Sequence, residues 1–248
     1  MNARILSLPS LVACALPVLA VAAPPNDLWE NRTLITTLPF SESVPAIETA
    51  TVDATDPAMF CVQLAEALPQ KNSVWYRYSP GASDAYVRIN SNGYDTLTMV
   101  LEGSPESGFR RVAGGCNDDA AGQGSGSIVH GLRLRAGGDY SILVTRYRGD
   151  DSATATLAFA ISASPVRLVT KTSDSNDGAC DTDCSLREAT LANTGTAGGA
   201  ILVPAGRYRV PGGLSLPVSG VFDLRHQKER DDHRCRCEGN PSNTARRG

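Results

Sequence analysis

The chain has 248 residues, which allows one large domain or two small ones, and a formal net charge of -3 at pH 7. This charge argues against a nucleic-acid-binding protein and against attraction to an anionic membrane surface, because both need an excess of basic residues. Aromatic residues make up only 6% of the chain and 23 residues are glycine; this balance favours an extracellular β protein with many turns over a helical enzyme.

Residues 1–22 have the pattern of a secretory signal peptide. After a short positive segment, residues 5–20 are apolar, and Ala20-Val21-Ala22 is a small-x-small cleavage site. We therefore expect a secreted or cell-surface protein whose mature chain begins near Ala23. Lipidation of Cys14 is the alternative, because the residues before it resemble a lipobox. No other segment is long and apolar enough to span a bilayer, so we expect no membrane span.

The remaining cysteines fit an oxidising compartment. Cys61, Cys116, Cys180 and Cys184 precede the tail of the chain and suggest two disulfides. The simplest of the three pairings joins Cys61 to Cys116 and Cys180 to Cys184. Metal binding is the alternative, although no histidine accompanies these cysteines at zinc spacing.

Short β segments separated by turn residues extend from residue 31 to about residue 162. They alternate apolar and polar residues, as strands with one buried face do. The predicted strands are residues 32–38, 73–79, 85–90, 96–102, 127–134, 140–147 and 153–161. Residues 58–68 have a helical rhythm and predict a short helix or turn. An apolar sheet face must be buried on another sheet, so the pattern predicts an all-β fold, either a barrel or a jelly-roll-like antiparallel sandwich.

A different pattern begins at residue 166. Ser185 can cap a helix over residues 185–193, because Glu188 three residues later completes a capping box. Predicted strands flank this helix at residues 166–170, 200–203 and 207–210. Residues 225–248 contain no large apolar side chain, cannot offset the entropy of ordering by burial, and are predicted to be disordered.

Five motifs occur in a characteristic order in the first part of the chain. They are Asn26-Asp27-Leu28-Trp29-Glu30-Asn31, Val74-Trp75-Tyr76-Arg77-Tyr78, Tyr94-Asp95-Thr96-Leu97, Cys116-Asn117-Asp118-Asp119 and Tyr140-Ser141-Ile142-Leu143-Val144. This series resembles the bacterial pre-peptidase C-terminal (PPC-like) β-sandwich domain over residues 24–163. The resemblance implies an accessory module of a secreted hydrolase or surface protein. Such a module would bind an extracellular polymer or a surface protein, and some members bind calcium.

An acidic turn in this part of the chain offers oxygen atoms that could bind calcium. Calcium takes six to eight oxygen ligands, including carboxylates and carbonyls. Asn117, Asp118 and Asp119 place several oxygen atoms on one turn, and Asp95 lies in another. The sequence therefore predicts a calcium site from these four residues, with Asp27 as a further candidate. A solvated turn without a metal is the alternative, since Asn and Asp favour turns in any case.

The second part of the chain carries a sharper motif. Cys184-Ser185-Leu186-Arg187-Glu188-Ala189 resembles the CSLREA motif region, which opens a right-handed parallel β-helix in large secreted or outer-surface proteins. The resemblance implies that residues 166–224 form the N-terminal cap and first coil of such a helix, with a Cys180–Cys184 disulfide closing the loop. We expect structural roles for residues 185–189. A weak surface ion pair is the alternative for Arg187 and Glu188.

The sequence departs from this family after the first coil. A solenoid needs about three repeats to be stable, yet the strand and glycine-rich turn expected next do not follow. With suitable codons for residues 231–238, a one-base shift of the reading frame would encode Thr-Ile-Ile-Gly-Ala-Gly-Ala-Arg. We therefore hypothesise that residues 225–248 are a frameshifted tail and that the chain is a truncated relative of a longer surface protein.

The sequence offers no recognisable catalytic constellation. His130 lies in an alternating strand, and there is no nucleophile elbow, zinc-protease pair or phosphate loop. Asp118 and Asp119 are adjacent, so on a strand they would point to opposite sides. We therefore expect a non-catalytic binding or interaction module rather than an enzyme. The alternative is an N-terminal accessory fragment of a secreted polysaccharide-active enzyme or peptidase.

Overall fold

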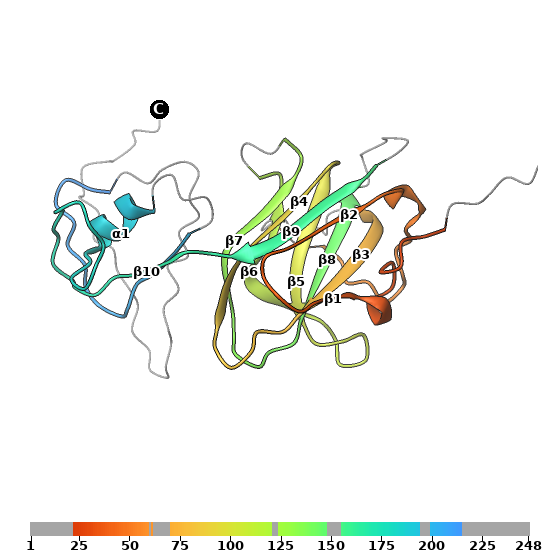
Figure 1. The fold of residues 1–248 in the computed structure, drawn as a ribbon, viewed down its shortest axis with the longest axis horizontal. Helices are drawn as coiled ribbons and strands as arrows, with labels where there is room; N and C mark the ends of the chain where they lie inside the picture. Colours follow the sequence, from red (N-terminus) through yellow and green to blue (C-terminus); the bar gives the residue numbers. More distant parts are fainter. Residues whose placement is uncertain are drawn as a thin grey trace, which may run out of the picture.

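The computed structural model describes residues 22–59, 61, 70–120, 124–147, 155–193 and 199–214. Figure 1 shows a β-sandwich followed by a smaller unit. The signal-peptide prediction, most of the predicted helical segment 58–68 and the tail 225–248 lie outside the described residues. None of the helices in the described part of the chain is long and apolar enough to cross a membrane.

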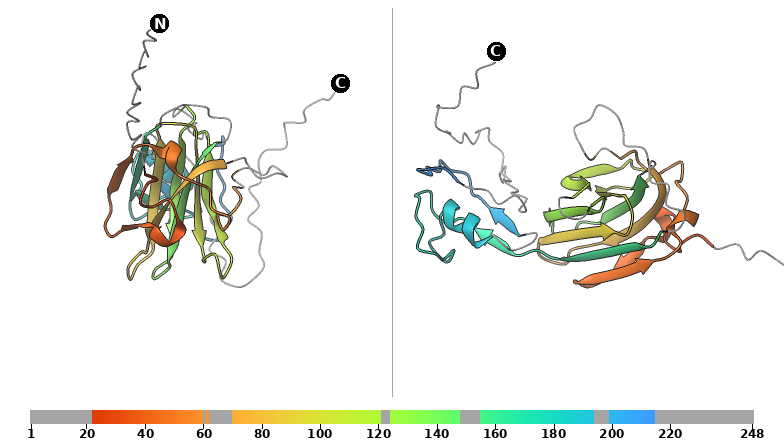
Figure 2. Two further views of the ribbon diagram at one scale, coloured as in Figure 1. Left: turned by 90° about the vertical axis from the view of Figure 1, so that its right-hand side faces the viewer. Right: turned by 90° about the horizontal axis from the view of Figure 1, so that it is seen from above.

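Two sheets form the sandwich and pack face to face (Figure 2). The five-stranded sheet has the order β1 (Thr33–Ile35), β3 (Gln70–Tyr78), β8 (Tyr140–Tyr147), β5 (Thr96–Glu102) and β6 (Arg110–Asp118). The four-stranded sheet has the order β2 (Phe40–Val44), β9 (Leu157–Ala163), β4 (Ala85–Asn92) and β7 (Ser127–Leu134). Neighbouring strands are antiparallel except β1 and β3, which are parallel. The predicted all-β fold with antiparallel sheets is confirmed.

Two of these strands were not predicted, and one predicted strand is absent. Strand β6 contains Gly114-Gly115, which the sequence pattern presents as a turn. A Cβ atom on Gly115 would lie 3.0 Å from Cβ of Val100 on β5, so close packing between strands explains this glycine. Strand β2 is short and mostly polar. Residues 207–210 are not a strand; instead Tyr208 donates a hydrogen bond to the carbonyl of Pro204 at 2.8 Å.

The core between the sheets centres on stacked aromatic rings. Tyr76 of β3 and Phe159 of β9 have ring centroids 3.8 Å apart and an interplanar angle of 6°. Phe40 of β2 packs against both rings. Each side chain points inward because alternate residues of a strand face the same side. Aromatic contact thus joins strands from both sheets.

The central strands of the five-stranded sheet are buried on their second face as well. Residues 96–101 of β5 are all buried, so this strand does not expose alternate residues. On the outer face, Trp75 and Leu143 form a second cluster with Met59, and Phe109 stacks on Trp75 at a centroid distance of 5.5 Å. Two segments outside the sheets, around residues 26–31 and 53–61, take part in covering this face.

Specific bonds hold these covering segments in place. Asn26 donates its amide to the carbonyl of Trp75 at 3.0 Å, and the N–H of Trp75 donates to the carbonyl of Asn26 at 2.9 Å. Trp29 donates its indole N–H to Oγ of Ser141 at 3.1 Å. Cys61 forms a disulfide with Cys116 of β6, as in the simplest pairing.

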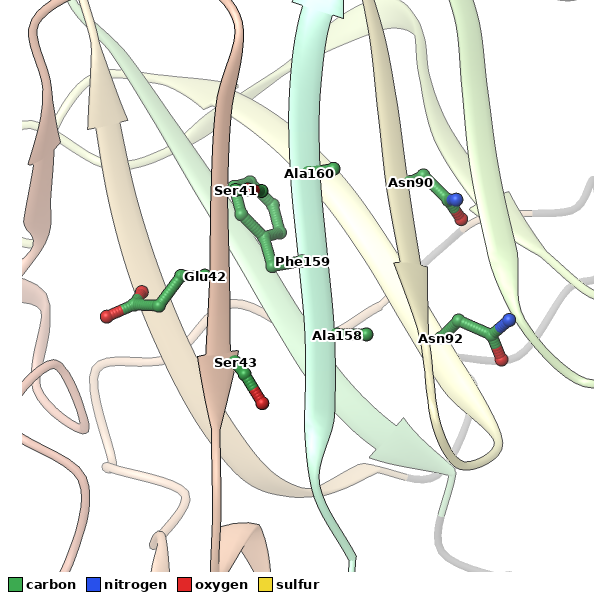
Figure 3. Close-up of a pocket in the computed structure, with 8 residues that line it drawn as sticks. All are labelled: Ser41, Glu42, Ser43, Asn90, Asn92, Ala158, Phe159 and Ala160. Carbon is green, nitrogen blue, oxygen red and sulfur yellow. The ribbon is translucent and has the colours of Figure 1, made fainter.

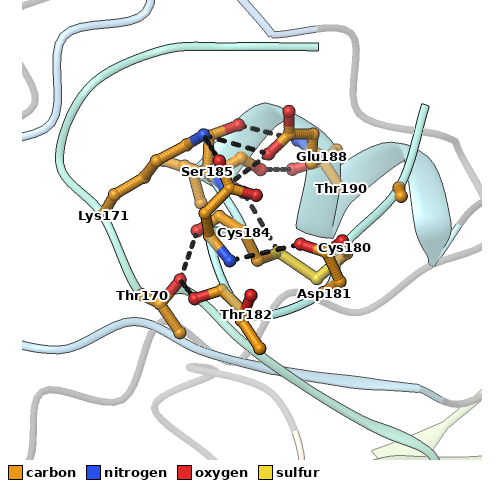
Figure 4. Close-up of a disulfide and its surroundings, with 12 residues drawn as sticks. Thr170, Lys171, Cys180, Asp181, Thr182, Cys184, Ser185, Glu188 and Thr190 are labelled. Atoms are coloured by element: carbon orange, nitrogen blue, oxygen red, sulfur yellow. Dashed lines mark hydrogen bonds and ion pairs between the residues drawn. A yellow bond between two sulfur atoms is a disulfide. The ribbon is translucent and has the colours of Figure 1, made fainter. Parts of the chain in front are cut away.

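The smaller unit is built around a parallel strand pair and one helix. Strand β10 (Val166–Leu168) pairs in parallel with β11 (Ala200–Leu202). Helix α1 (Leu186–Ala192) begins after Ser185, whose hydroxyl accepts from the N–H of Glu188 at 3.1 Å. The carboxylate of Glu188 accepts from the N–H of Ser185 at 2.7 Å, which confirms the predicted capping box. The second disulfide joins Cys180 to Cys184 (Figure 4).

Glu188 is a buried structural residue whose carboxylate also lies 3.9 Å from Lys171 Nζ. It is only 2% exposed and also accepts hydrogen bonds from Oγ of Ser175 at 2.7 Å and from the N–H of Asp177 at 3.2 Å. Hydrogen bonds from the Ser185 backbone and the Ser175 side chain lower the pKa of Glu188 to about 2. Since these donors come from the preceding loop, the helix start and that loop are fixed together.

Arg187 joins two further parts of this unit. Its guanidinium pairs with Asp174 at 2.9 Å and donates to the carbonyls of Pro211 at 2.7 Å and Gly213 at 3.2 Å. The arginine therefore links the loop before α1 to the chain that follows β11.

Truncation of Phe159 tests the aromatic core. Phe159→Ala removes the ring that stacks on Tyr76 and leaves a cavity between the sheets, so the free energy of unfolding should fall by about 3–5 kcal/mol. Phe159→Leu keeps most of the apolar volume and should cost about 1 kcal/mol. Urea unfolding followed by tryptophan fluorescence measures both. Equal losses in the two variants would contradict the cavity argument, because they would show that apolar volume at this position does not offset the loss of the ring.

Candidate functional site

Three aspartates meet where β5 begins and β6 ends. Asp95 lies in the turn before β5, Asp118 is the last residue of β6, and Asp119 follows it. Leu97 pairs with Asp118 in the β5–β6 register, so the turn before β5 lies beside the end of β6. One carboxylate oxygen from each aspartate lies within 4.8 Å of the others. We refer to Asp95, Asp118 and Asp119 as the aspartate cluster.

The backbone conformation of Asp119 brings its carboxylate to the cluster. Its φ angle is 55°, in the left-handed region. Asp and Asn adopt this region more readily than most residues. The expectation that Asp118 and Asp119 point to opposite sides is therefore wrong, because the strand ends at Asp118 and the chain turns at Asp119.

A network of buried hydroxyl groups fixes the strand ends beside the aspartate cluster. Thr96 Oγ1 donates to the carbonyl of Ser91 at 3.1 Å and accepts from the N–H of Ser127 at 2.9 Å. Ser127 Oγ donates to the carbonyl of Asn117 at 3.0 Å, and Ser91 Oγ bonds Thr98 Oγ1 at 2.6 Å. These residues lie on β4, β5, β6 and β7, so the network ties both sheets together. No sequence pattern predicts this network, because single Ser and Thr residues in strands carry no distinctive spacing.

The other two predicted ligands, Asn117 and Asp27, accept hydrogen bonds from other segments, and Asp27 is not part of the aspartate cluster. Asn117 Oδ1 accepts a hydrogen bond from the N–H of Ile128 at 2.7 Å, which joins β6 to β7. Asp27 accepts from the N–H of Thr51 at 2.6 Å and from its hydroxyl at 3.0 Å. Both side chains satisfy backbone groups of neighbouring segments and are engaged there.

Mutual repulsion and partial burial alter the chemistry of Asp118. Burial raises its pKa first, and the charges of Asp119 and then Asp95 raise it further, to about 6. All three causes disfavour the ionised form. Near pH 7 the cluster therefore holds carboxylates whose mutual repulsion a bound cation or a proton would relieve.

The donor set of the cluster suits a hard divalent cation. Calcium and magnesium prefer carboxylate, carbonyl and water oxygen atoms, and calcium tolerates irregular geometry better. Three carboxylates supply part of the six to eight oxygen atoms that calcium takes, and backbone carbonyls and water can supply the rest. The cluster consists of carboxylates alone, which gives no preference for the softer metals that thiolate or imidazole ligands select.

No protein-family model and no curated protein matches this chain. Among solved structures, it is similar to the CBM22-1–GH10 modules of the Clostridium thermocellum N-terminal endo-1,4-β-D-xylanase 10B, complexed with xylohexaose. The identity is 12%, the TM-score is 0.23, and the match covers 67% of this chain and 34% of the xylanase chain. A similarity at this TM-score carries no argument about fold or function.

The titration of Asp118 is a direct test of the cluster. Its folded pKa of about 6 lies above the ordinary value of about 3.9. The native state therefore binds the proton more tightly than the unfolded state. The corresponding contribution to stability is present below about pH 4 and is lost as the pH rises through about 6. Carbon-13 NMR of the Asp118 carboxyl in metal-free buffer should show this pKa.

Substitutions of Asp119 and Asp95 distinguish the contributions of these two residues to the pKa of Asp118. Asp119→Asn should lower the pKa of Asp118 more than Asp95→Asn does, because Asp119 contributes the larger repulsion. Asp139→Asn, which alters an exposed residue paired with Arg77, serves as the control. A titration near pH 4 in the unaltered protein would contradict the geometry of the cluster.

Proposed function

We propose that this chain is an exported protein of the cell surface or extracellular space. In this proposal, residues 24–163 are a non-catalytic binding module that calcium stabilises. The aspartate cluster is the observation that carries the proposal, because three crowded carboxylates favour a bound cation. Extracellular modules bind calcium at about 0.1–1 mM, so a cluster with few protein ligands fits that setting.

The disulfides support the assignment to an oxidising compartment. The Cys61–Cys116 bond fastens a covering segment to β6, and the Cys180–Cys184 bond lies in the smaller unit. Disulfides persist in secreted and surface proteins and are rare in the reducing cytosol. Export through the segment 1–22, with cleavage near Ala23, is the corresponding part of the proposal.

The same proposal gives residues 166–224 the role of cap and first coil of a parallel β-helix. The parallel pairing of β10 with β11 supports it, since strands of successive coils pair in this way. Fixation by Arg187 and Glu188 supports it further. A cap has to be a rigid end layer on which the next coil can stack.

Calcium should stabilise the sandwich through the aspartate cluster. At pH 7.5, calcium at about ten times its Kd should add about 1.4 kcal/mol to the free energy of unfolding and raise the Tm by a few degrees. Asp118→Asn should raise the Tm without calcium, because it removes repulsion, and should abolish the calcium response. Differential scanning fluorimetry measures both effects. Asp139→Asn is the control and should respond to calcium as the unaltered protein does.

Protons and calcium should compete for the cluster. Because the pKa of Asp118 is about 6, the calcium shift in Tm should be smaller at pH 5 than at pH 7.5. A calcium response that persists in Asp118→Asn would remove the cluster from the proposal.

Co-sedimentation and fragment-release assays on the full chain test whether it binds a polymer without cleaving it. We expect it to co-sediment with at least one insoluble extracellular polymer from a panel of polysaccharides and collagen, and to release no soluble fragments from it. Reducing-sugar and amine assays of the supernatant measure release. Sustained release of fragments by the purified chain would show an enzyme. Absence of binding to every polymer would overturn the binding role.

A further inference from the structure

The outer face of the four-stranded sheet carries a shallow groove. Its volume is about 390 Å³, and it crosses β2, β9 and β4 (Figure 3). The residues that line it are Ser41, Glu42, Ser43, Asn90, Asn92, Ala158, Phe159 and Ala160. The side chains of Asn90, Asn92 and Ala158 point to one side of the sheet, whereas those of Glu42 and Phe159 point to the other.

The residue types on the outer face explain the groove. Cross-strand pairing places Ser41 beside Ala160, and Ala160 beside Asn90. Ser43, Ala158 and Asn92 form the next row in the same way. Small side chains on β2 and β9 therefore leave a low floor, and the amide side chains on β4 border it.

Unpaired cationic and polar groups continue along this face beyond the groove. Arg88, two residues before Asn90 on β4, faces the same side and pairs with no carboxylate among the described residues. Among the residues that the structure describes, Arg88 Nε and His130 Nδ1 beyond the groove and Asn90 Oδ1 at its border are shielded from water and have no hydrogen-bond partner. Arg88 also lies close enough to His130 to help lower the pKa of the imidazole, after burial.

The strand order restricts what this face can bind. Strand β9 is paired on both sides, by β2 and β4, and β4 is paired by β9 and β7. The backbone groups of β9 and β4 at the groove are therefore already used, so a peptide lying across the groove cannot add to them as a strand; only β2 is an edge strand there. A ligand must be held by amides, hydroxyls and a guanidinium, and by contact with the methyl groups of Ala158 and Ala160.

We propose that this face, from the groove to Arg88, binds a segment of an acidic polysaccharide. Sugar hydroxyls both donate and accept hydrogen bonds, which suits Asn90, Asn92 and the serines. A carboxylate on the sugar pairs with Arg88, and the C–H face of the ring rests on the alanines. The inference rests on the proposed binding function and gives it a site and a ligand class.

Polygalacturonate is the probe, and its fully methyl-esterified form is the neutral control with the same backbone. Affinity electrophoresis of the full chain should detect binding to the acidic form and at least tenfold weaker binding to the ester. Arg88→Gln should weaken binding to polygalacturonate by about tenfold, the effect expected for loss of one charge-assisted hydrogen bond. Asn90→Ala should weaken it to a smaller extent.

Arg110→Gln is the matched control, because it removes the same charge from an exposed site on β6, in the other sheet. It should leave the affinity within about twofold, as only general screening changes. Equal losses in Arg88→Gln and Arg110→Gln would show nonspecific charge attraction and overturn the site. Melting temperatures confirm that each variant is folded.

The outcomes also separate this inference from the proposed function. If the chain binds another polymer but not polygalacturonate, or if binding survives both Arg88→Gln and Asn90→Ala, the acidic-polysaccharide site is overturned and the binding function stands. If no polymer binds, both are overturned.

Discussion

Burial of both faces of the central strands β5 and β8 of the five-stranded sheet is the constraint on which the rest of the structure depends. A two-sheet sandwich buries only the facing surfaces of its sheets, yet β5 and β8 are buried throughout most of their length. The outer face of these two strands has to be covered by segments of the chain outside the sheets. Reciprocal bonds between Asn26 and Trp75 and the Cys61–Cys116 disulfide supply it. The two segments are therefore part of the fold, and their removal would expose Trp75.

The same constraint positions the aspartate cluster. The disulfide fixes β6 at Cys116, two residues before Asp118, and the buried hydroxyl network fixes the starts of β5 and β7. With these ends immobilised, Asp95 and Asp118 cannot separate to relieve their repulsion. Protonation or a bound cation would relieve this repulsion, so the raised pKa of Asp118 and the proposed calcium site follow from one geometry.

The alternation of apolar and polar residues predicted most strands, because it follows from burial of one strand face. It fails where a strand is shaped by other contacts. Strand β6 was missed because Gly115 is needed for close approach to Val100. The helix and its capping box were predicted, since Ser185 and Glu188 interact locally. At the site, Asp118 and Asp119 could be named from the sequence, but their meeting with Asp95 depends on the β5–β6 register. The hydrogen bond that Asn117 Oδ1 accepts from Ile128 could not be predicted, because Ile128 lies on another strand.

The two outer faces of the sandwich differ in a way that bears on binding. The chain covers the centre of the outer face of the five-stranded sheet with its own apolar side chains, so that part of the face is not available to a flat partner. The four-stranded sheet instead carries small and polar residues, including Ser41, Ala158 and Asn90, which would be a poor surface for such a cover. Strand β9 of this sheet leads directly into β10 (Figure 1), and Gly131 of β7 contacts Ala200 of β11. A polymer lying across this face would therefore be held next to the smaller unit.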